Sequence, residues 1–297
     1  MDEPTVEPRD DFGDGTMSRR RFLNRVALVT GASATALGFA RVMGETSAGA
    51  QVLAEPGGVQ GSPPFKQDER LVVERAEYDA AGTKMAGYLA RLKGGSKRPA
   101  VLVIHENRGL TPHIQDVARR FAVEGFLAFA PDILSPFGGT PADDARVREL
   151  FAGLNPEETV ARLAAAVPFL AKHRESTGKV GVVGFCWGGG MANRLAAAGT
   201  SLNAAVPYYG TQLPAAEVPK ISAPLLLHYA ALDERIDAGI PAFEAALKAN
   251  KKPYELFMYE GAQHAFNNDS NPARYNKAAA DLAWTRTVAF LKKHLGT

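Results

Sequence analysis

The sequence predicts an α/β fold, with a mostly parallel central sheet and helices on both faces. Continuous apolar runs at 100–104, 126–130, 180–185 and 204–208 lack the polar alternation of a half-exposed strand, so both faces of each strand are expected to be covered. Segments with helical periodicity separate most of these runs. Strands and helices that alternate in this way are typical of a parallel sheet between two layers of helices.

The elements can be assigned in order after residue 70. A hairpin is predicted over 71–78 and 85–92, because the residues between the two runs favour a turn. Pro131 is expected to end the strand at 126–130. We find no internal repeat and no second domain boundary, so 70–297 is predicted to be one domain. The other predicted elements are strands at 100–104, 180–185, 204–208, 224–229 and 254–259, and helices at 112–123, 142–154, 157–172, 191–198, 240–249 and up to residue 295.

Residues 1–50 have the pattern of an export signal. Arg19, Arg20 and Arg21 precede Phe22-Leu23 and a modest apolar run, and small residues at 48–50 offer a cleavage site. Paired arginines before Phe-Leu resemble the twin-arginine signal, which carries folded proteins across a membrane. We therefore expect a partner in the twin-arginine export machinery and a periplasmic or secreted mature protein. A membrane anchor is the alternative, but the apolar run is short and diluted by polar residues.

The rest of the composition excludes several classes of protein. Residues 51–69 are rich in Gly, Pro, Gln and Ser and are predicted to be a linker or a flexible arm. After residue 50 the chain has 28 basic and 25 acidic side chains and no basic stripe with interleaved aromatic residues, so nucleic acid is not an expected partner. The mature form is expected not to be embedded in a membrane. A single cysteine excludes an internal disulfide.

The stretch Gly184-Phe185-Cys186-Trp187-Gly188 lies between a predicted strand and a predicted helix. A strand, a sharp turn flanked by glycines and a helix form a nucleophile elbow, in which the central side chain is exposed on a strained backbone. The central residue is usually serine, and here it is the only cysteine of the chain. The other interpretation of Cys186 is a small hydrophobic side chain at a strand end.

Two further residues follow predicted strands in the order expected for a catalytic triad. Asp233 comes after the strand at 224–229, and His264 comes after the strand at 254–259. Nucleophile, acid and histidine occur in this order in α/β-hydrolases, whose sites lie at the carboxyl ends of the strands. The thiolate is the reactive form of cysteine, histidine moves the proton, and the carboxylate orients the histidine. Alternatively, Asp233 is a helix cap and His264 a surface loop residue.

The loop after the strand at 100–104 supplies the next candidates. In this fold, one oxyanion donor is the amide after the nucleophile, here Trp187, and the second comes from that loop. We assign the second donor to the backbone N–H of Asn107. The carboxylate of Glu106 is expected to perturb the thiol; otherwise it is a solvated loop acid. His105 and His228 flank or lie in apolar strands and are interpreted as core histidines.

With these motifs the chain resembles the dienelactone hydrolase family from about residue 70 to its end. The resemblance implies a triad of Cys186, Asp233 and His264, and it implies that Glu106 helps to generate the thiolate when substrate enters. Members of the family open an unsaturated lactone by attack on its carbonyl and form an acyl-enzyme that water releases. The matching segments are His105-Glu106-Asn107-Arg108-Gly109, Pro131-Asp132, Gly184-Phe185-Cys186-Trp187-Gly188-Gly189, Tyr208-Tyr209-Gly210, Asp233 and Gly261-Ala262-Gln263-His264-Ala265-Phe266.

The chain departs from the family's pattern where the substrate carboxylate is bound. Type members hold it with one arginine shortly after Pro-Asp and another a few residues after the catalytic histidine. Here these regions read Ile133-Leu134-Ser135-Pro136-Phe137 and Ala265-Phe266-Asn267-Asn268-Asp269, without arginine. Arg108 is therefore a candidate partner for a substrate anion, with a surface ion pair as the alternative. Tyr208 and Tyr209 are candidates for the pocket lining, with core packing as the alternative.

The predicted activity is hydrolysis of a small ester or lactone, without a cofactor. No cluster of histidine, cysteine and carboxylate residues has the spacing of a metal site, so we expect no metal. A thioesterase or a broad carboxylesterase would use the same residues and cannot be separated from this activity by sequence. A non-catalytic binding protein on the same scaffold is the alternative of another class, although all three triad residues and Glu106 are present.

Overall fold

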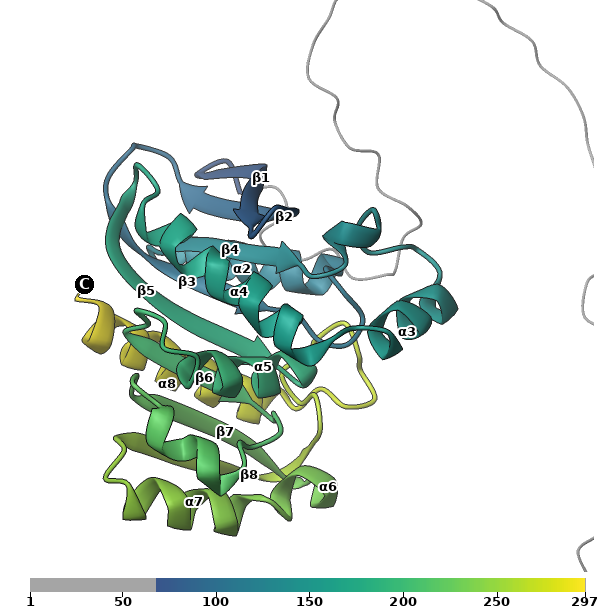
Figure 1. Cartoon of the computed structure of the whole chain (residues 1–297), viewed down its shortest axis with the longest axis vertical. Helices are drawn as coiled ribbons and strands as arrows, with labels where there is room; N and C mark the ends of the chain where they lie inside the picture. Colours follow the sequence, from purple (N-terminus) through teal and green to yellow (C-terminus); the bar gives the residue numbers. More distant parts are fainter. Residues whose placement is uncertain (1–67, 297) are drawn as a thin grey trace, which may run out of the picture. The chain divides into compact units, whose positions relative to one another are not determined.

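The sheet of this protein has eight strands in the order β1-β2-β4-β3-β5-β6-β7-β8 (Figure 1). The computed structural model describes residues 68–296, so the predicted signal at 1–50 and the predicted linker up to residue 67 lie outside the described residues. Strands β3 to β8 run parallel, β2 runs antiparallel to β4, and β1 pairs antiparallel with β2. The predicted, mostly parallel α/β fold is confirmed.

The elements follow the predicted order. The strands are β1 (Leu71–Ala80), β2 (Thr83–Leu92), β3 (Arg98–Ile104), β4 (Leu127–Asp132), β5 (Ser176–Phe185), β6 (Ala204–Tyr208), β7 (Leu225–Leu232) and β8 (Tyr254–Gln263). The helices are α2 (Pro112–Val123), α3 (Asp144–Ala152), α4 (Pro156–Ala171), α5 (Trp187–Ala196), α6 (Glu234–Asp237), α7 (Ile240–Ala249) and α8 (Lys277–Leu295), with 3-10 turns η1 (Ser135–Phe137) and η2 (Ala215–Lys220). Within the described residues, no helix is long and apolar enough to cross a membrane.

The helices cover both faces of the sheet, as Figure 1 shows. Strand β5 illustrates the two cores, because Val180 and Val182 pack into the core under α4, α5 and α7. Val183 and Phe185, the alternate residues of the same strand, pack into the core under α2 and α8. Both sets of side chains are buried, which explains why the strand reads as an unbroken apolar run. Pairing with β3 on one side and β6 on the other places β5 inside the sheet.

Some predicted boundaries differ from the structure. Strand β4 continues through Pro131 to Asp132, because its pairing with β3 stops at Phe129 while its pairing with β2 goes on. Proline lacks only the amide donor, so it interrupts one ladder and not the other. Helix α5 begins at Trp187 and not at residue 191. The glycines at 188–190 are weak helix formers, so helical propensity placed the start of α5 too late.

The turn from β5 into α5 requires glycine on both sides of Cys186. A Cβ atom on Gly184 would lie 2.0 Å from the carbonyl oxygen of Gly188. A Cβ atom on Gly188 would lie 2.5 Å from the carbonyl oxygens of Ile104 and His105, at the end of β3. Backbone atoms of neighbouring strands cannot move aside as a flexible side chain can. The glycines therefore let the first turn of α5 pack directly against the end of β3.

This contact predicts that Gly188→Ala destabilises the protein by about 1–3 kcal/mol, the usual cost of overpacking. Urea unfolding followed by circular dichroism would measure the change. Gly190→Ala is the matched control, because its added Cβ would lie 3.6 Å from the nearest atom and alanine favours helix. Equal effects of the two substitutions would contradict the proposed close contact.

Candidate active site

The carboxyl ends of the parallel strands bring the predicted residues to one edge of the sheet. Strand β3 leads into Glu106 and Asn107, and β5 leads into Cys186. Strand β7 ends at the residue before Asp233, and β8 ends at the residue before His264. Because these strands are parallel, their carboxyl ends share an edge, which is where α/β proteins place their ligands.

Cys186 occupies the elbow in a strained backbone conformation. Its φ is 55° and its ψ is −115°, and a positive φ is a backbone conformation that non-glycine residues seldom adopt. It is the residue before the first turn of α5, and its amide donates to the carbonyl of Tyr208 at 3.1 Å. Strain of this kind persists only where surrounding contacts hold it, and it is concentrated at functional sites.

The environment of the Cys186 thiol favours its protonated form. Burial raises the pKa of the thiol, and the carboxylate of Glu106 raises it further. The amides of Trp187 and Asn107, which face the sulfur, and the charge of Arg235 lower the pKa but do not outweigh these effects. The structure thus brings three of the predicted groups near the sulfur: the carboxylate of Glu106 and the backbone amides of Asn107 and Trp187.

Asp233 and His264 form a hydrogen-bonded pair. The Nδ1 atom of His264 bonds to Oδ2 of Asp233 across the ends of β7 and β8. Asp233 precedes α6, yet its side chain makes no hydrogen bond that caps this helix. Its carboxylate bonds to the imidazole of His264 instead. The bond to Nδ1 leaves Nε2 of His264 as the nitrogen that can exchange a proton. Within residues 68–296 no hydrogen bond joins His264 to the thiol.

Glu106 is held by a residue that sequence reasoning did not single out. Asn268 donates from Nδ2 to Oε2 of Glu106 at 2.9 Å, and both residues are buried. Asn268 lies in the segment after His264 where the family's second arginine was sought. A neutral amide in this place satisfies the carboxylate without cancelling its charge, so that charge still acts on the thiol.

Comparison with known proteins assigns the chain to a family. A family model described as "Dienelactone hydrolase family" matches residues 85–295. The chain belongs to this family. It is 33% identical over 253 residues to a Saccharolobus solfataricus protein named "Putative carboxymethylenebutenolidase", with 73% of this chain and 96% of that protein covered. The assignment confirms the resemblance seen in the sequence and supports a hydrolase that acts on a lactone or an ester.

Solved structures agree with this assignment. A "Putative Dienelactone Hydrolase" from Klebsiella pneumoniae has a TM-score of 0.68 and 29% identity, with 75% of this chain and 99% of that chain covered. A dienelactone hydrolase-like promiscuous phosphotriesterase from metagenomic libraries has a TM-score of 0.67 and 25% identity, with 76% and 100% covered. The fold is therefore the α/β-hydrolase fold of this family.

The two tyrosines after β6 have different positions in this dienelactone hydrolase family member. Tyr209 lies beside the site, because its ring centroid is 5.0 Å from that of His264. Burial raises the pKa of Tyr209, and the charges of Glu106 and Cys186 raise it further. Tyr208 is a core residue whose hydroxyl bonds to Thr287 at 2.6 Å, so its prediction as a pocket residue is corrected. Tyr209 follows the last residue of β6 and has a φ of 39°, so it is not part of the strand, although both rings pack against Phe266.

The predicted anion partner is already paired. Arg108 forms an ion pair with Asp144 of α3, and both side chains are 58% exposed. The alternative interpretation of Arg108, a surface ion pair, agrees with this geometry. Arg235 was missed by sequence reasoning, although it follows Asp233 by two residues. It is exposed, its charge reaches the thiol, and it has no ion-pair partner among residues 68–296.

A partly buried charge network fixes the loop that carries His264 and Asn268. Asp269 accepts hydrogen bonds from Nδ1 of His113 at 3.1 Å and from Arg120, both on α2. Burial opposes ionisation of Asp269, but these bonds prevail and lower its pKa to about 2. The carboxylate is therefore charged at neutral pH and ties the loop to the helix layer.

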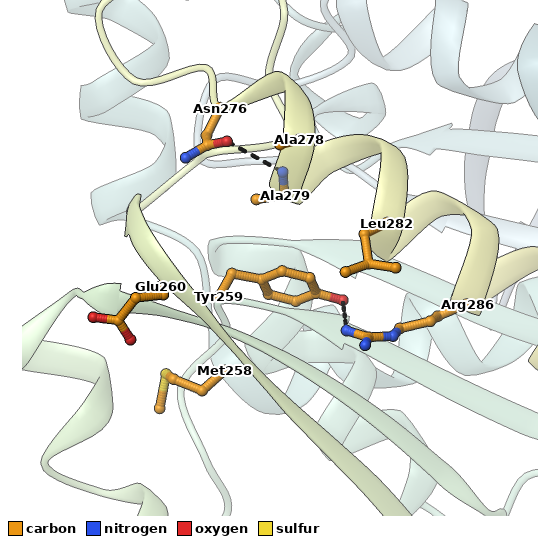
Figure 2. Close-up of a pocket in the computed structure, with 8 residues that line it drawn as sticks. All are labelled: Met258, Tyr259, Glu260, Asn276, Ala278, Ala279, Leu282 and Arg286. Carbon is orange, nitrogen blue, oxygen red and sulfur yellow. Dashed lines mark hydrogen bonds between the residues drawn. The ribbon is translucent and has the colours of Figure 1, made fainter.

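A hollow of about 330 Å³ lies away from this site, between β8 and α8 (Figure 2). Two of its polar groups are already paired: Arg286 donates to the Tyr259 hydroxyl at 3.2 Å, and the side chain of Asn276 accepts from the amide of Ala279 at 3.1 Å. None of the predicted catalytic residues lines it. In the described part of the chain, no three histidine, cysteine or carboxylate residues are grouped as metal ligands would be.

The charge of Glu106 predicts an unusual pair of effects for Glu106→Gln. Glutamine keeps an acceptor for Asn268 but removes the charge, so the thiol pKa should fall. Each unit of that fall increases the thiolate fraction at neutral pH about tenfold. Iodoacetamide alkylation across pH 6–10 would measure it, and alkylation of Cys186 at pH 7 should become faster.

Turnover of an ester is the second measurement for this variant. It should decrease in Glu106→Gln if Glu106 takes part in forming the thiolate on substrate entry. Glu217→Gln, which removes a charge paired with Lys220 on the surface, is the control and should change neither rate. An unchanged alkylation midpoint in Glu106→Gln would show that the two groups do not interact.

Proposed function

We propose that the chain hydrolyses small carboxylic esters or lactones through Cys186, His264 and Asp233. The observation that carries the proposal is the environment of the sulfur, which faces the backbone amides of both Trp187 and Asn107. Two amides aimed at one nucleophile match the requirement of acyl transfer, in which a carbonyl oxygen becomes an anion next to that nucleophile. Membership of the dienelactone hydrolase family supports the same reaction class.

In the first half of the proposed reaction, the substrate acylates the cysteine. His264 takes the thiol proton on Nε2, and the thiolate attacks the carbonyl carbon to form a C–S bond. The π electrons move to the carbonyl oxygen, which accepts hydrogen bonds from the amides of Asn107 and Trp187. Collapse of this intermediate breaks the bond to the ester oxygen. The leaving oxygen takes the proton from His264, and a thioester remains on Cys186.

In the second half, water hydrolyses the thioester. Nε2 of His264 accepts a proton from the water as its oxygen attacks the acyl carbon, and the same two amides hold the new oxyanion. The C–S bond then breaks, the sulfur leaves and recovers a proton from His264, and the acid departs. Asp233 stays ionised throughout and stabilises the transient imidazolium through its bond to Nδ1.

The electrostatics assign Glu106 a role in timing this reaction. Its charge opposes thiolate formation in the free protein, so the thiol is less reactive before a substrate is bound. A neutral thiol is also less open to oxidation, which matters for a single cysteine if the protein is exported. The proposed export rests on residues 1–50, whose paired arginines and apolar run support a twin-arginine signal and a periplasmic or secreted location.

A thioesterase or a broad carboxylesterase would use the same residues, so the proposal is tested with a mixed panel. Dienelactone, a neutral nitrophenyl ester and an acyl thioester would be offered to the protein and to Cys186→Ala. We expect turnover by the protein and a loss of at least about 10³-fold in the variant, as for removal of a nucleophile. Acid-quenched samples should show the acyl mass on the peptide that contains Cys186.

The variant Asp233→Asn serves as a second test of the triad. It should retain the acyl-enzyme but turn over more slowly by about 10²–10⁴-fold, because asparagine fixes the wrong tautomer of His264. Undiminished turnover by Cys186→Ala would overturn the cysteine mechanism. Turnover with no acyl mass on Cys186 would overturn the covalent intermediate.

We further propose that Arg235 contributes to the binding of acidic substrates. The arginine positions of the type members are not matched, Arg108 is paired with Asp144, and Arg235 is exposed and unpaired among residues 68–296. Arg235→Gln should raise KM for dienelactone, which carries a carboxylate, by about tenfold and leave KM for the neutral ester unchanged.

Steady-state kinetics of both substrates would measure this difference. Arg108→Gln is the matched control, since it removes an exposed arginine that already has a partner. A larger effect of Arg108→Gln on the acidic substrate would reverse the assignment and return the role to the residue indicated by sequence.

A further inference from the structure

His105 lies between the two residues whose amides face the thiol, and the proposed mechanism leaves it unused. It follows β3 and is 1% exposed. Its Nδ1 lies 2.7 Å from the carbonyl oxygen of Glu106, and its Nε2 lies 3.3 Å from the amide of Ile133, which follows β4. The ring thus bridges the carboxyl ends of two neighbouring strands at the edge that carries the site.

The two contacts determine the tautomer of His105. The amide of Ile133 can only donate, so Nε2 must accept and carries no proton. The proton of the neutral ring is therefore on Nδ1, which donates it to the carbonyl of Glu106. Burial lowers the pKa of His105, in agreement with a neutral ring. A neutral imidazole satisfies both partners, and the protonated form would lose the bond from Ile133.

The bond to Glu106 fixes one of the two oxyanion donors. The carbonyl of Glu106 and the N–H of Asn107 belong to one planar trans peptide, so they point in opposite directions. A donor that fixes the carbonyl therefore also fixes the direction of the N–H, which faces the sulfur. The amide of Gly109 is the other donor to this carbonyl, at 3.4 Å, so the contact from His105 is the closer one.

The ring of His105 also contacts the residue that provides the second donor. Its plane is stacked on the indole of Trp187, with ring centroids 5.6 Å apart and an angle of 14° between the planes. Phe151 of α3 packs edge-on against both rings, at 5.8 Å from His105 and 5.1 Å from Trp187. The three rings hold the end of β3 against the start of α5.

We propose that His105 is a positioning residue that aligns the amides of Asn107 and Trp187 as an oxyanion hole. This inference rests on the proposed function, because an oxyanion forms only in acyl transfer. The role differs from that of the triad: His105 does not touch the substrate and exchanges no proton. It holds the Glu106–Asn107 peptide through Nδ1, the end of β4 through Nε2, and Trp187 through its face.

Three substitutions separate these contacts. His105→Phe keeps a flat ring against Trp187 but has neither hydrogen bond. His105→Asn places an amide nitrogen where Nδ1 was and keeps the bond to the carbonyl of Glu106. His105→Gln places a side-chain oxygen where Nε2 was, and this oxygen can still accept the hydrogen bond from the backbone N–H of Ile133. Comparison of the Asn and Gln variants remains informative even if the Phe variant does not fold.

Two reactions of the same thiol provide the readout. Hydrolysis of the best ester in the panel needs an oxyanion hole, whereas alkylation by iodoacetamide displaces iodide and forms no oxyanion. His105→Phe should lower kcat by about 10²-fold, in the range found when one oxyanion donor is lost, with KM changed less than about threefold. His105→Asn should recover most of the loss, and His105→Gln should not. The limiting alkylation rate of Cys186 at high pH, where the thiol is fully ionised, should stay within about twofold in all three variants, because it does not depend on the thiol pKa that the two amides lower.

Each alternative has a distinct outcome. A fall in the limiting alkylation rate that matches the fall in kcat would mean that His105 supports the fold of the whole site. Equal recovery of kcat in His105→Asn and His105→Gln would show that the bond to the carbonyl of Glu106 has no special role. Either result overturns the inference. Turnover that survives Cys186→Ala would instead overturn the proposed function, so the two failures can be told apart. Thermal unfolding by circular dichroism confirms that each variant is folded.

Discussion

The close contact between the start of α5 and the end of β3 is the constraint on which the candidate site depends. There is no room for a Cβ atom at Gly184 or Gly188, so backbone packs directly on backbone. This contact sets the strained conformation of Cys186 and brings the amides of Asn107 and Trp187 to its sulfur. Sites of acyl transfer need donors that are fixed before the charge develops, and close backbone packing supplies that rigidity.

Electrostatics then decides the resting state of the site. Burial and Glu106 favour a protonated thiol, while two amides and Arg235 favour the thiolate. Asn268 holds Glu106 without neutralising it, and Asp269 in the next position ties the same loop to α2. The loop that follows β8 thus positions two groups: it holds Glu106 near the thiol of Cys186, and it carries His264. A substrate that displaces water from the site would change this balance, because each charge acts more strongly where water is absent.

Much of the fold and part of the site could be predicted from local pattern. The bounds of α2, α7 and β6 agree with the predicted ranges, because their periodicity is strong and proline or polar residues mark their ends. The start of α5 was misplaced, since tertiary contacts stabilise glycines that are weak helix formers on their own. Tyr208 and Tyr209 are equivalent in sequence, and only their contacts in the folded protein distinguish Tyr208, which bonds to Thr287, from Tyr209, which lies beside His264.

The sequence by itself determined the α/β fold, the family, and which residues follow the strand ends. Hydrophobic periodicity and motif spacing are set by residues that are close together in the chain. Only the tertiary structure decided which side chains meet. It paired Asp233 with His264, Arg108 with Asp144 and Asn268 with Glu106, each across dozens of residues or more. It also set His105 between the two oxyanion donors. Such partners depend on sheet order and loop path, which no local pattern encodes, since contacts between distant residues form only when the strands are aligned.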